Sequence, residues 1–302
     1  MTGLTLPQIS TRYEWVENLE NATTSFTVTS ASTLRALEDE IRVNGADALL
    51  SHIRFCGNIP EHYAHDSTAE KAYSKYTDAV VAEALRFIGM NAIVVEGRAD
   101  MADVEADAND FSLVADAKAF RLTRTAKNQK DFKVTSMDRW RYDRDYALVI
   151  APIDHLPITN SQIYFDASNR NVCILTWSHL AALVQAKVAF GSNFAQSLLH
   201  QILKEPRKIP PSKSAIAYWR AINQAMTDYD QQMADIWAEE KLANYQVLEL
   251  LKKDALEYLR SEKSRIAHLS REDAIQILLD SSKVFSRMEI VSDKSISALF
   301  DI

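Results

Sequence analysis

The six residues from 113 to 118, Leu-Val-Ala-Asp-Ala-Lys, predict a short strand that ends in a carboxylate and an ammonium group. Successive strand residues point to opposite faces, so Asp116 and Lys118 project from the same face. The apolar residues before them indicate a partly buried strand, and Asp103 supplies a second carboxylate upstream. Two neighbouring carboxylates in a buried strand are costly without a cation. The pattern therefore favours a sheet that holds a divalent metal beside a lysine.

An isolated Asp-x-Lys is a weak signal, because such short matches arise by chance in a chain of 302 residues. The plainest alternative is an ion pair on an exposed strand, which would contribute about 0–1 kcal/mol to stability. The identity of the first carboxylate is also open, since Asp100, Asp107 and Asp110 compete with Asp103. The neighbouring sequence has to decide between these interpretations.

The segment that follows the Asp-x-Lys pattern is strongly basic. Residues 118–144 contain nine Lys or Arg against three Asp, although the whole chain has a net charge of −7. An acidic protein can still present one basic face to a polyanion. Arg, Lys, Asn and Gln in this segment are also the side chains that pair with guanine and adenine in the major groove. We therefore expect duplex DNA as a partner.

The run from Val114 to Val134 closely resembles the corresponding segment of the HindIII family of type II restriction endonucleases, which have the PD-(D/E)xK nuclease fold. The resemblance extends to residues 66–71, 145–149 and 176–180. One departure is Ala102, which stands where the family pattern often has proline before the first aspartate. Proline coordinates nothing, so this difference leaves the chemistry of the pattern unchanged.

The resemblance implies Mg²⁺-dependent hydrolysis of a phosphodiester, with one or two metal ions in each active site. Mg²⁺ prefers hard oxygen ligands and keeps several waters, so Asp103 and Asp116 suffice as side-chain ligands, and the resemblance adds the backbone carbonyl of Ala117. Lys118 is expected to orient or help deprotonate the attacking water. Glu70 is a candidate supporting acid, with an ordinary helix-capping role as its alternative.

The resemblance also implies a target and an assembly. The expected target is the palindrome AAGCTT, cut after the first adenine to leave 5′-phosphate ends, and a palindrome implies a homodimer. A repair nuclease or junction resolvase of the same fold, or a non-catalytic DNA-binding protein, remains an alternative. The lysines could contact phosphates without reading bases. The expected DNA-contacting residues are Arg121, Arg124, Lys127, Asn128, Gln129, Lys130 and Lys133.

Apolar spacing and turn residues predict an α/β (α+β) fold with a central mixed sheet flanked by helices. Helices are expected over residues 31–55, with a break near Gly45, and from an N-cap at Ser67 or Thr68 to about residue 88. Four strands are expected at residues 91–96, 111–118, 146–150 and 172–176. We expect a catalytic core with an N-terminal helical part at 1–203, and a helical region at 204–302 packed on that core.

Bulk composition fits a globular protein. Hydrophobic residues make up 47% of the chain and charged residues 25%. No apolar run approaches the roughly 20 residues that a membrane span needs, and no basic region followed by an apolar stretch opens the sequence. We therefore expect a cytoplasmic protein without a membrane partner.

Overall fold

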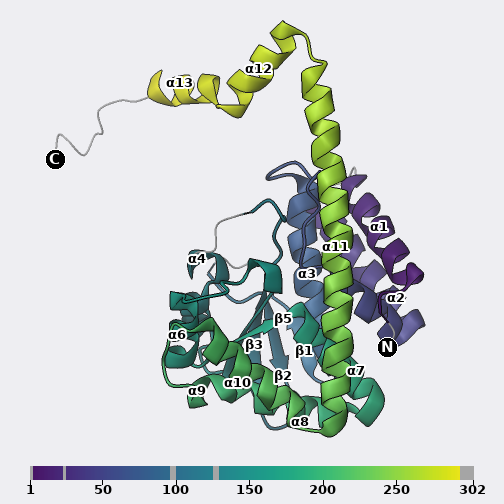
Figure 1. Cartoon of the computed structure of the whole chain (residues 1–302), viewed down its shortest axis with the longest axis vertical. Coiled ribbons are helices and arrows are strands. Elements are labelled where there is room, and N and C mark those ends of the chain that lie inside the picture. The colour runs from purple at the N-terminus through teal and green to yellow at the C-terminus, as the bar shows by residue number, and fades with distance from the viewer. Residues whose placement is uncertain (1–2, 23–24, 96–99, 125–128, 293–302) are drawn as a thin grey trace, which may run out of the picture. The chain divides into compact units, whose positions relative to one another are not determined.

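The computed structural model describes residues 3–22, 25–95, 100–124 and 129–292. The chain forms two compact units, 1–252 and 253–302, and their boundary falls within the long helix α11 (Gln231–Ala267). The larger unit contains the central sheet (Figure 1).

A five-stranded mixed sheet forms the centre of the larger unit, with the strands in chain order. The first three strands are antiparallel neighbours, and the third, fourth and fifth are parallel. The predicted mixed α/β architecture is thus confirmed. The strands are β1 (Asn91–Val94), β2 (Val104–Asp107), β3 (Ser112–Ala117), β4 (Tyr146–Ala151) and β5 (Val172–Thr176).

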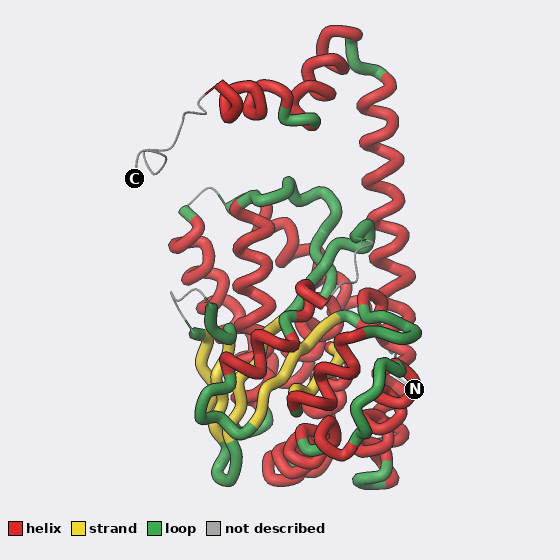
Figure 2. Tube along the Cα trace, turned by 90° about the vertical axis from the view of Figure 1, so that its left-hand side faces the viewer, coloured by secondary structure: helices red, strands yellow, loops and turns green. Residues whose placement is uncertain are grey.

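Helices cover both faces of the sheet, which explains why β4 and β5 are almost entirely buried. Helix α3 (Thr68–Phe87) packs against β1, β2 and β3, while α5 (Val134–Trp140) and α6 (Gln162–Arg170) contact β3, β4 and β5. Figure 1 shows α3 and α6 on opposite sides of the sheet, and Figure 2 shows the strands between layers of helices. Parallel strands need such crossover helices.

The N-terminal helices α1 (Leu6–Glu20) and α2 (Phe26–Phe55) pack against each other, and α2 also packs along α3. Helix α2 is interrupted at Gly45, whose φ of 63° and ψ of −136° are not helical. A positive φ is open to glycine because it lacks a Cβ atom. The break predicted near this glycine is present.

The sequence predicted four strands, and the structure adds a fifth, β2, with the sequence Val-Glu-Ala-Asp. Ala, Glu and Asp are depleted in strands, so local propensity gives no signal there. The strand exists because β1 and β3 pair with it on either side. Long-range pairing therefore overrides the local preference.

The compact unit continues past residue 203 through α9 (Glu205–Lys208) and α10 (Ala215–Thr227). The Tyr218 hydroxyl of α10 accepts a hydrogen bond from Ile174 N at 2.6 Å and donates one to Ile174 O at 3.3 Å. Helix α10 thereby satisfies the backbone of β5. The compact unit thus extends to residue 252, and the division into a catalytic core at 1–203 and a helical region at 204–302 stays a prediction.

Several further helices complete the described chain. In the smaller unit, α12 (Arg271–Ser281) contacts α13 (Val284–Ser292), and Ser270 caps α12 by accepting a hydrogen bond from Asp273 N at 3.1 Å. The remaining elements are α4 (Gln129–Phe132), the 3₁₀ helix η1 (Ile153–His155), α7 (Trp177–Phe190) and α8 (Ser192–Leu203).

Candidate active site

The register of β2 and β3 brings the two predicted carboxylates together. Val104 pairs with Ala115 at the end of this antiparallel ladder, so the next position of the same register sets Asp103 opposite Asp116. The carbonyl of Asp103 accepts a hydrogen bond from Val95 N at 2.9 Å, which extends the pairing with β1 by one residue. Directly opposed residues lie about 5 Å apart. The backbone alone therefore places both carboxylates at one end of the sheet.

Lys118 completes this cluster as strand alternation predicts. Its backbone N donates to Ile150 O at 2.8 Å, and its carbonyl accepts from the Trp177 indole at 3.1 Å, so the chain stays extended beyond β3. The Lys118 ammonium group contacts Asp116 Oδ2. Both side chains are almost completely buried. The structure thus brings Asp103, Asp116 and Lys118 into one cluster.

Asp116 is fully buried, yet neither of its carboxylate oxygens accepts a hydrogen bond of good geometry from the part of the chain that the structure describes. Its neighbours are ammonium groups: Lys118 at Oδ2 and Lys133 Nζ at 3.7 Å from Oδ1. Burying a charge without hydrogen bonds is expensive, and such groups in folded proteins call for an explanation. The two oxygens have the chemistry of ligands that a hard cation would bind.

Helix α3 contributes two further charged residues that sequence reasoning missed. Lys75 Nζ lies 3.2 Å from Asp78 Oδ2 and 3.8 Å from Asp103 Oδ1. Together with Asp103, Lys118 and others, they line a pocket of about 390 Å³. Residues 71, 75 and 78 fall at helical spacing, so one face of α3 points at the pocket. This spacing is visible in the sequence and predicts that the three residues share a face of the helix. Only the packing of α3 on the sheet shows that this face lies beside Asp103 and Lys118.

The surroundings of Asp103 and Asp78 in this pocket oppose the ionisation of their carboxyl groups. Burial raises the pKa of Asp103, and the facing carboxylate of Asp116 raises it further. Burial also raises the pKa of Asp78, to about 8, and the charge of Asp103 adds to this effect. Like charges in a desolvated site oppose ionisation. A cation that binds among these carboxylates would relieve the same repulsion.

The rival aspartates have other partners. Asp100 Oδ1 accepts a hydrogen bond from the Trp140 indole at 3.2 Å, Asp107 pairs with Arg144, and Asp110 Oδ2 lies 3.4 Å from His200 Nδ1. None of the three lines the pocket around Lys118. Among the four candidates for the first carboxylate, the structure selects Asp103 by position.

Glu70 does not line this pocket, and its role as a supporting acid stays a prediction. It sits in the first turn of α3, accepts a hydrogen bond from Asp66 N at 2.6 Å and pairs with Arg121. Its own backbone N donates to Ser67 Oγ at 3.1 Å. These are the contacts that the alternative, helix-capping role of Glu70 predicts. Asp78, two turns further along the same helix, is the acid that reaches the pocket.

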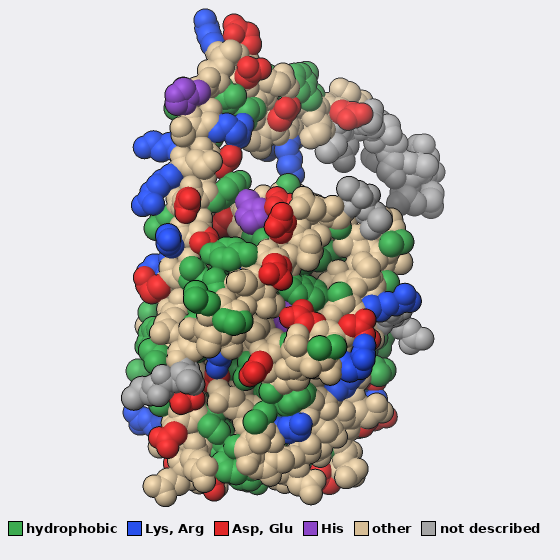
Figure 3. Space-filling view, turned by 90° about the vertical axis from the view of Figure 1, so that its right-hand side faces the viewer, with side chains coloured by type: hydrophobic (Ala, Val, Ile, Leu, Met, Phe, Trp, Pro, Cys, Tyr) green, Lys and Arg blue, Asp and Glu red, His purple; other side chains and the backbone are tan. Residues whose placement is uncertain are grey.

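The predicted DNA-contacting residues have different environments. Arg121 donates to Tyr63 O at 2.8 Å in addition to its pairing with Glu70, Arg124 pairs with Asp131, and Lys130 is exposed. Lys133 instead reaches into the pocket. Lys127 and Asn128 lie outside the described residues, as does the side chain of Gln129. On the face drawn in Figure 3, acidic and basic side chains are interspersed.

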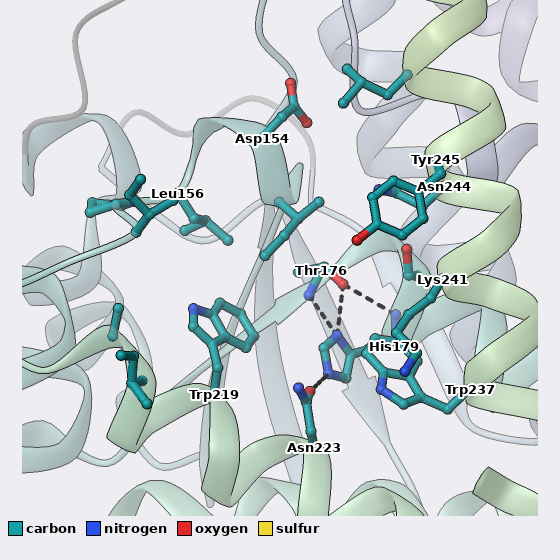
Figure 4. A pocket seen from close by; sticks show the side chains of 17 residues that line it. Asp154, Leu156, Thr176, His179, Trp219, Asn223, Trp237, Lys241, Asn244 and Tyr245 are labelled. Carbon is teal, nitrogen blue, oxygen red and sulfur yellow. Dashed lines mark hydrogen bonds between the residues drawn. The ribbon is translucent and has the colours of Figure 1, made fainter.

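A second hollow, of about 460 Å³, lies between η1, α10 and α11 and is lined mainly by aromatic and aliphatic side chains. Figure 4 shows Trp219, Trp237 and Tyr245 around it, with His179 beside Thr176 and Asn223. His179 Nδ1 lies 2.7 Å from Thr176 Oγ1, and its Nε2 lies 2.9 Å from Asn223 Oδ1. Burial lowers the pKa of His179 to about 4. With both nitrogens paired, this histidine has a structural role.

A mixed sheet flanked by helices, with two facing carboxylates and a lysine at the end of β3, defines a restriction-endonuclease-like protein. The model of the HindIII restriction endonuclease family matches residues 13–296. A curated relative, the type II restriction enzyme HindIII of Haemophilus influenzae, is 35% identical over 248 residues, which cover 79% of this chain and 81% of that protein. The chain therefore belongs to the HindIII restriction endonuclease family. Within the described residues, no helix is long and apolar enough to cross a membrane.

Proposed function

We propose that this protein is a Mg²⁺-dependent type II restriction endonuclease that cleaves both strands of duplex DNA. The observation that carries the proposal is the cluster at the end of β3. There the carboxylates of Asp103 and Asp116 face each other beside Lys118, and the buried oxygens of Asp116 accept no hydrogen bond from the described chain. Membership in a restriction endonuclease family supports the same chemistry.

The donor set fits a hard divalent cation. Asp103 and Asp116 would hold Mg²⁺ together with the backbone carbonyl of Ala117, a residue that lines the same pocket as Asp103. When bound, the metal would neutralise charge on a phosphate oxygen and lower the pKa of a water. Pairing of each carboxylate with an ammonium group alone leaves most of their lone pairs unused.

We assign two roles to Lys118: it orients the attacking water, and it stabilises the negative charge that develops during the reaction. Its backbone is held on both sides, by Ile150 O and by the Trp177 indole, so its ammonium group is confined near Asp116. A fixed ammonium group can orient a water and stabilise negative charge as it develops, without reorganisation during the reaction. In-line attack by that water breaks the bond to the 3′ oxygen, so the 5′ end keeps the phosphate.

The target that the family resemblance supports is AAGCTT, cut after the first adenine. A palindromic site requires the same contacts on both strands, which a two-fold symmetric homodimer supplies. The basic segment 118–144 follows the cleavage cluster directly in the sequence and would carry phosphate and base contacts. The homodimer and the cytoplasmic location are parts of this proposal.

Digestion of a plasmid of known sequence tests the proposal. The purified protein with Mg²⁺ should give discrete fragments whose ends map to AAGCTT and carry 5′-phosphates. A second plasmid with every AAGCTT changed by one base is the matched substrate control, and EDTA should abolish cleavage. Structure-dependent nicking would favour a repair nuclease or resolvase. Sequence-specific binding without cleavage would favour a non-catalytic DNA-binding protein.

A further inference from the structure

Asp116 has two ammonium neighbours, and they differ in their freedom to move. Lys118 contacts Oδ2 with a side chain that is 10% exposed, whereas Lys133, 3.7 Å from Oδ1, has a side chain that is 44% exposed. Lys133 Nζ also lies 5.0 Å from the centroid of the Trp140 ring. Lys118 cannot leave without opening a cavity in the protein. Lys133 can turn into solvent without such a cost.

The backbone at Lys133 is unusual for a lysine. Lys133 is the N-cap of α5 with φ 49° and ψ 24°, a left-handed conformation that residues with a Cβ atom disfavour. Its side chain makes no capping hydrogen bond. Asn or Gly would suit this backbone better, and Ser or Asp would suit the cap. Local structure therefore does not account for a lysine here, whereas the contact with Asp116 does.

We propose that Lys133 is a built-in counter-ion of Asp116, whose ammonium group neutralises this carboxylate while no metal is bound and turns away when a divalent cation binds. The inference rests on the proposed function, which assigns Asp116 to the metal. A buried carboxylate needs a positive partner in both states. An ammonium group and a divalent cation at the same oxygen repel each other, so only one of them can hold that position.

Two consequences follow from this competition. Lys133 lowers the affinity of the DNA-free protein for a divalent cation, because the cation has to displace it. Once displaced, the ammonium group is available to a DNA phosphate, which would hold it away from Asp116. Binding of DNA and of metal would then assist each other by the same factor, as thermodynamic linkage requires.

The test measures metal binding without DNA. Mn²⁺, which also prefers carboxylate oxygens, is titrated into the wild-type protein, Lys133→Met and Lys130→Met, and the free ion is counted by electron paramagnetic resonance. Lys130 is the control because it is an exposed lysine of the same basic segment. Lys133→Met should bind Mn²⁺ about 10-fold more tightly than wild type, and Lys130→Met within about two-fold. Unchanged or weaker binding by a folded Lys133→Met would overturn the proposal.

Lys133→Arg is a second variant, which keeps the positive charge at this position. It tests the mechanism even if Lys133→Met does not fold. It should bind Mn²⁺ as the wild type does, and tightening in this variant would contradict a charge-based mechanism.

Trp140 gives an independent signal, since movement of Lys133 removes a cation from its ring. Addition of Mg²⁺ should change the tryptophan fluorescence of the wild type but not that of Trp140→Phe or Lys133→Met. A fluorescence change on addition of Mg²⁺ that persists in Lys133→Met would also refute the proposed role of Lys133 as a counter-ion.

Failure of this inference is distinguishable from failure of the proposed function. Plasmid cleavage by the wild type together with no tightening in Lys133→Met would refute only the counter-ion. Absence of cleavage by the wild type would refute the nuclease proposal. Tighter Mn²⁺ binding by Lys133→Met would still support competition at Asp116 in that case.

Discussion

Two buried acids of this protein, Glu240 and Asp116, have opposite surroundings. Glu240 of α11 is 1% exposed and receives hydrogen bonds from Arg54 of α2, at 2.6 Å to Oε1 and 3.3 Å to Oε2, and another from Gln185 of α7. Asp116 is 0% exposed, and neither of its oxygens accepts a hydrogen bond from the described residues. The two carboxylates are therefore about equally buried, but only Glu240 has hydrogen-bond donors for both of its oxygens among the described residues.

The difference separates a structural acid from a functional one. Arg54 and Gln185 fix Glu240 from two helices, so that charge ties α2, α7 and α11 together. Asp116 instead shares its surroundings with Asp103, a like charge that raises the cost of folding. Repulsion between buried carboxylates is typical of sites where these groups act on a ligand. Variants of the two acids and of their partners test this division.

The largest effect is expected for Arg54→Met, which leaves the buried Glu240 without its counter-charge. Loss of one partner of a buried ion pair should lower the free energy of unfolding by about 3–5 kcal/mol, measured by urea denaturation. The double variant Arg54→Met/Glu240→Leu should regain most of that loss, because no buried charge remains unpaired. A double variant as unstable as the single one would show that packing, not charge, explains the effect.

Asp116→Asn should reduce the cleavage rate at least about 100-fold, about 2.7 kcal/mol in transition-state stabilisation, because an amide is a poor ligand for a cation. Its thermal stability should change little, because the lost repulsion from Asp103 and the lost pairing with Lys118 oppose each other. Plasmid cleavage and thermal denaturation measure the two properties. A strongly destabilised Asp116→Asn would place Asp116 with Glu240 among the structural acids.

His179 should behave as a structural group with a distinct pH dependence. Its pKa is lowered to about 4 in the folded protein from 6.5, so between these values the unfolded chain binds the proton and the folded protein does not. Acidification in that window therefore destabilises the fold. Between pH 6.5 and pH 5 this single group should cost about 2 kcal/mol.

The comparison that isolates this effect is wild type against His179→Gln, because Asp103 and Asp78, whose pKa values are raised, respond to pH in the opposite direction. Urea denaturation at pH 5 and pH 6.5 gives the two free energies for each protein. The wild type should lose more stability on acidification than the variant. Equal losses would show that His179 is protonated in the folded state.

The smallest effect is expected for Glu70→Gln. Glu70 pairs with Arg121 and caps α3 without lining the pocket, so its neutralisation should cost about 1 kcal/mol of stability. The cleavage rate at saturating Mg²⁺ should stay within a few-fold of wild type. A loss comparable to that of Asp116→Asn would establish Glu70 as a supporting acid.

The sequence by itself determined the features that depend on short-range periodicity. Alternation along a strand requires Asp116 and Lys118 to share a face, and the structure brings them into contact. The start of α3 at Ser67 and the interruption of α2 at Gly45 follow from local backbone preferences in the same way. These features need only a few neighbouring residues, so a pattern in the sequence is enough to predict them.

The tertiary structure alone decided which distant residues join that pair. Four aspartates competed for the place of the first carboxylate, and the register of β2 with β3 selects Asp103. Packing of α3 on the sheet adds Lys75 and Asp78, and the left-handed turn before α5 aims Lys133 at Asp116. Strand register and helix docking are set by the burial of a whole face, a collective property that no short segment of the sequence carries.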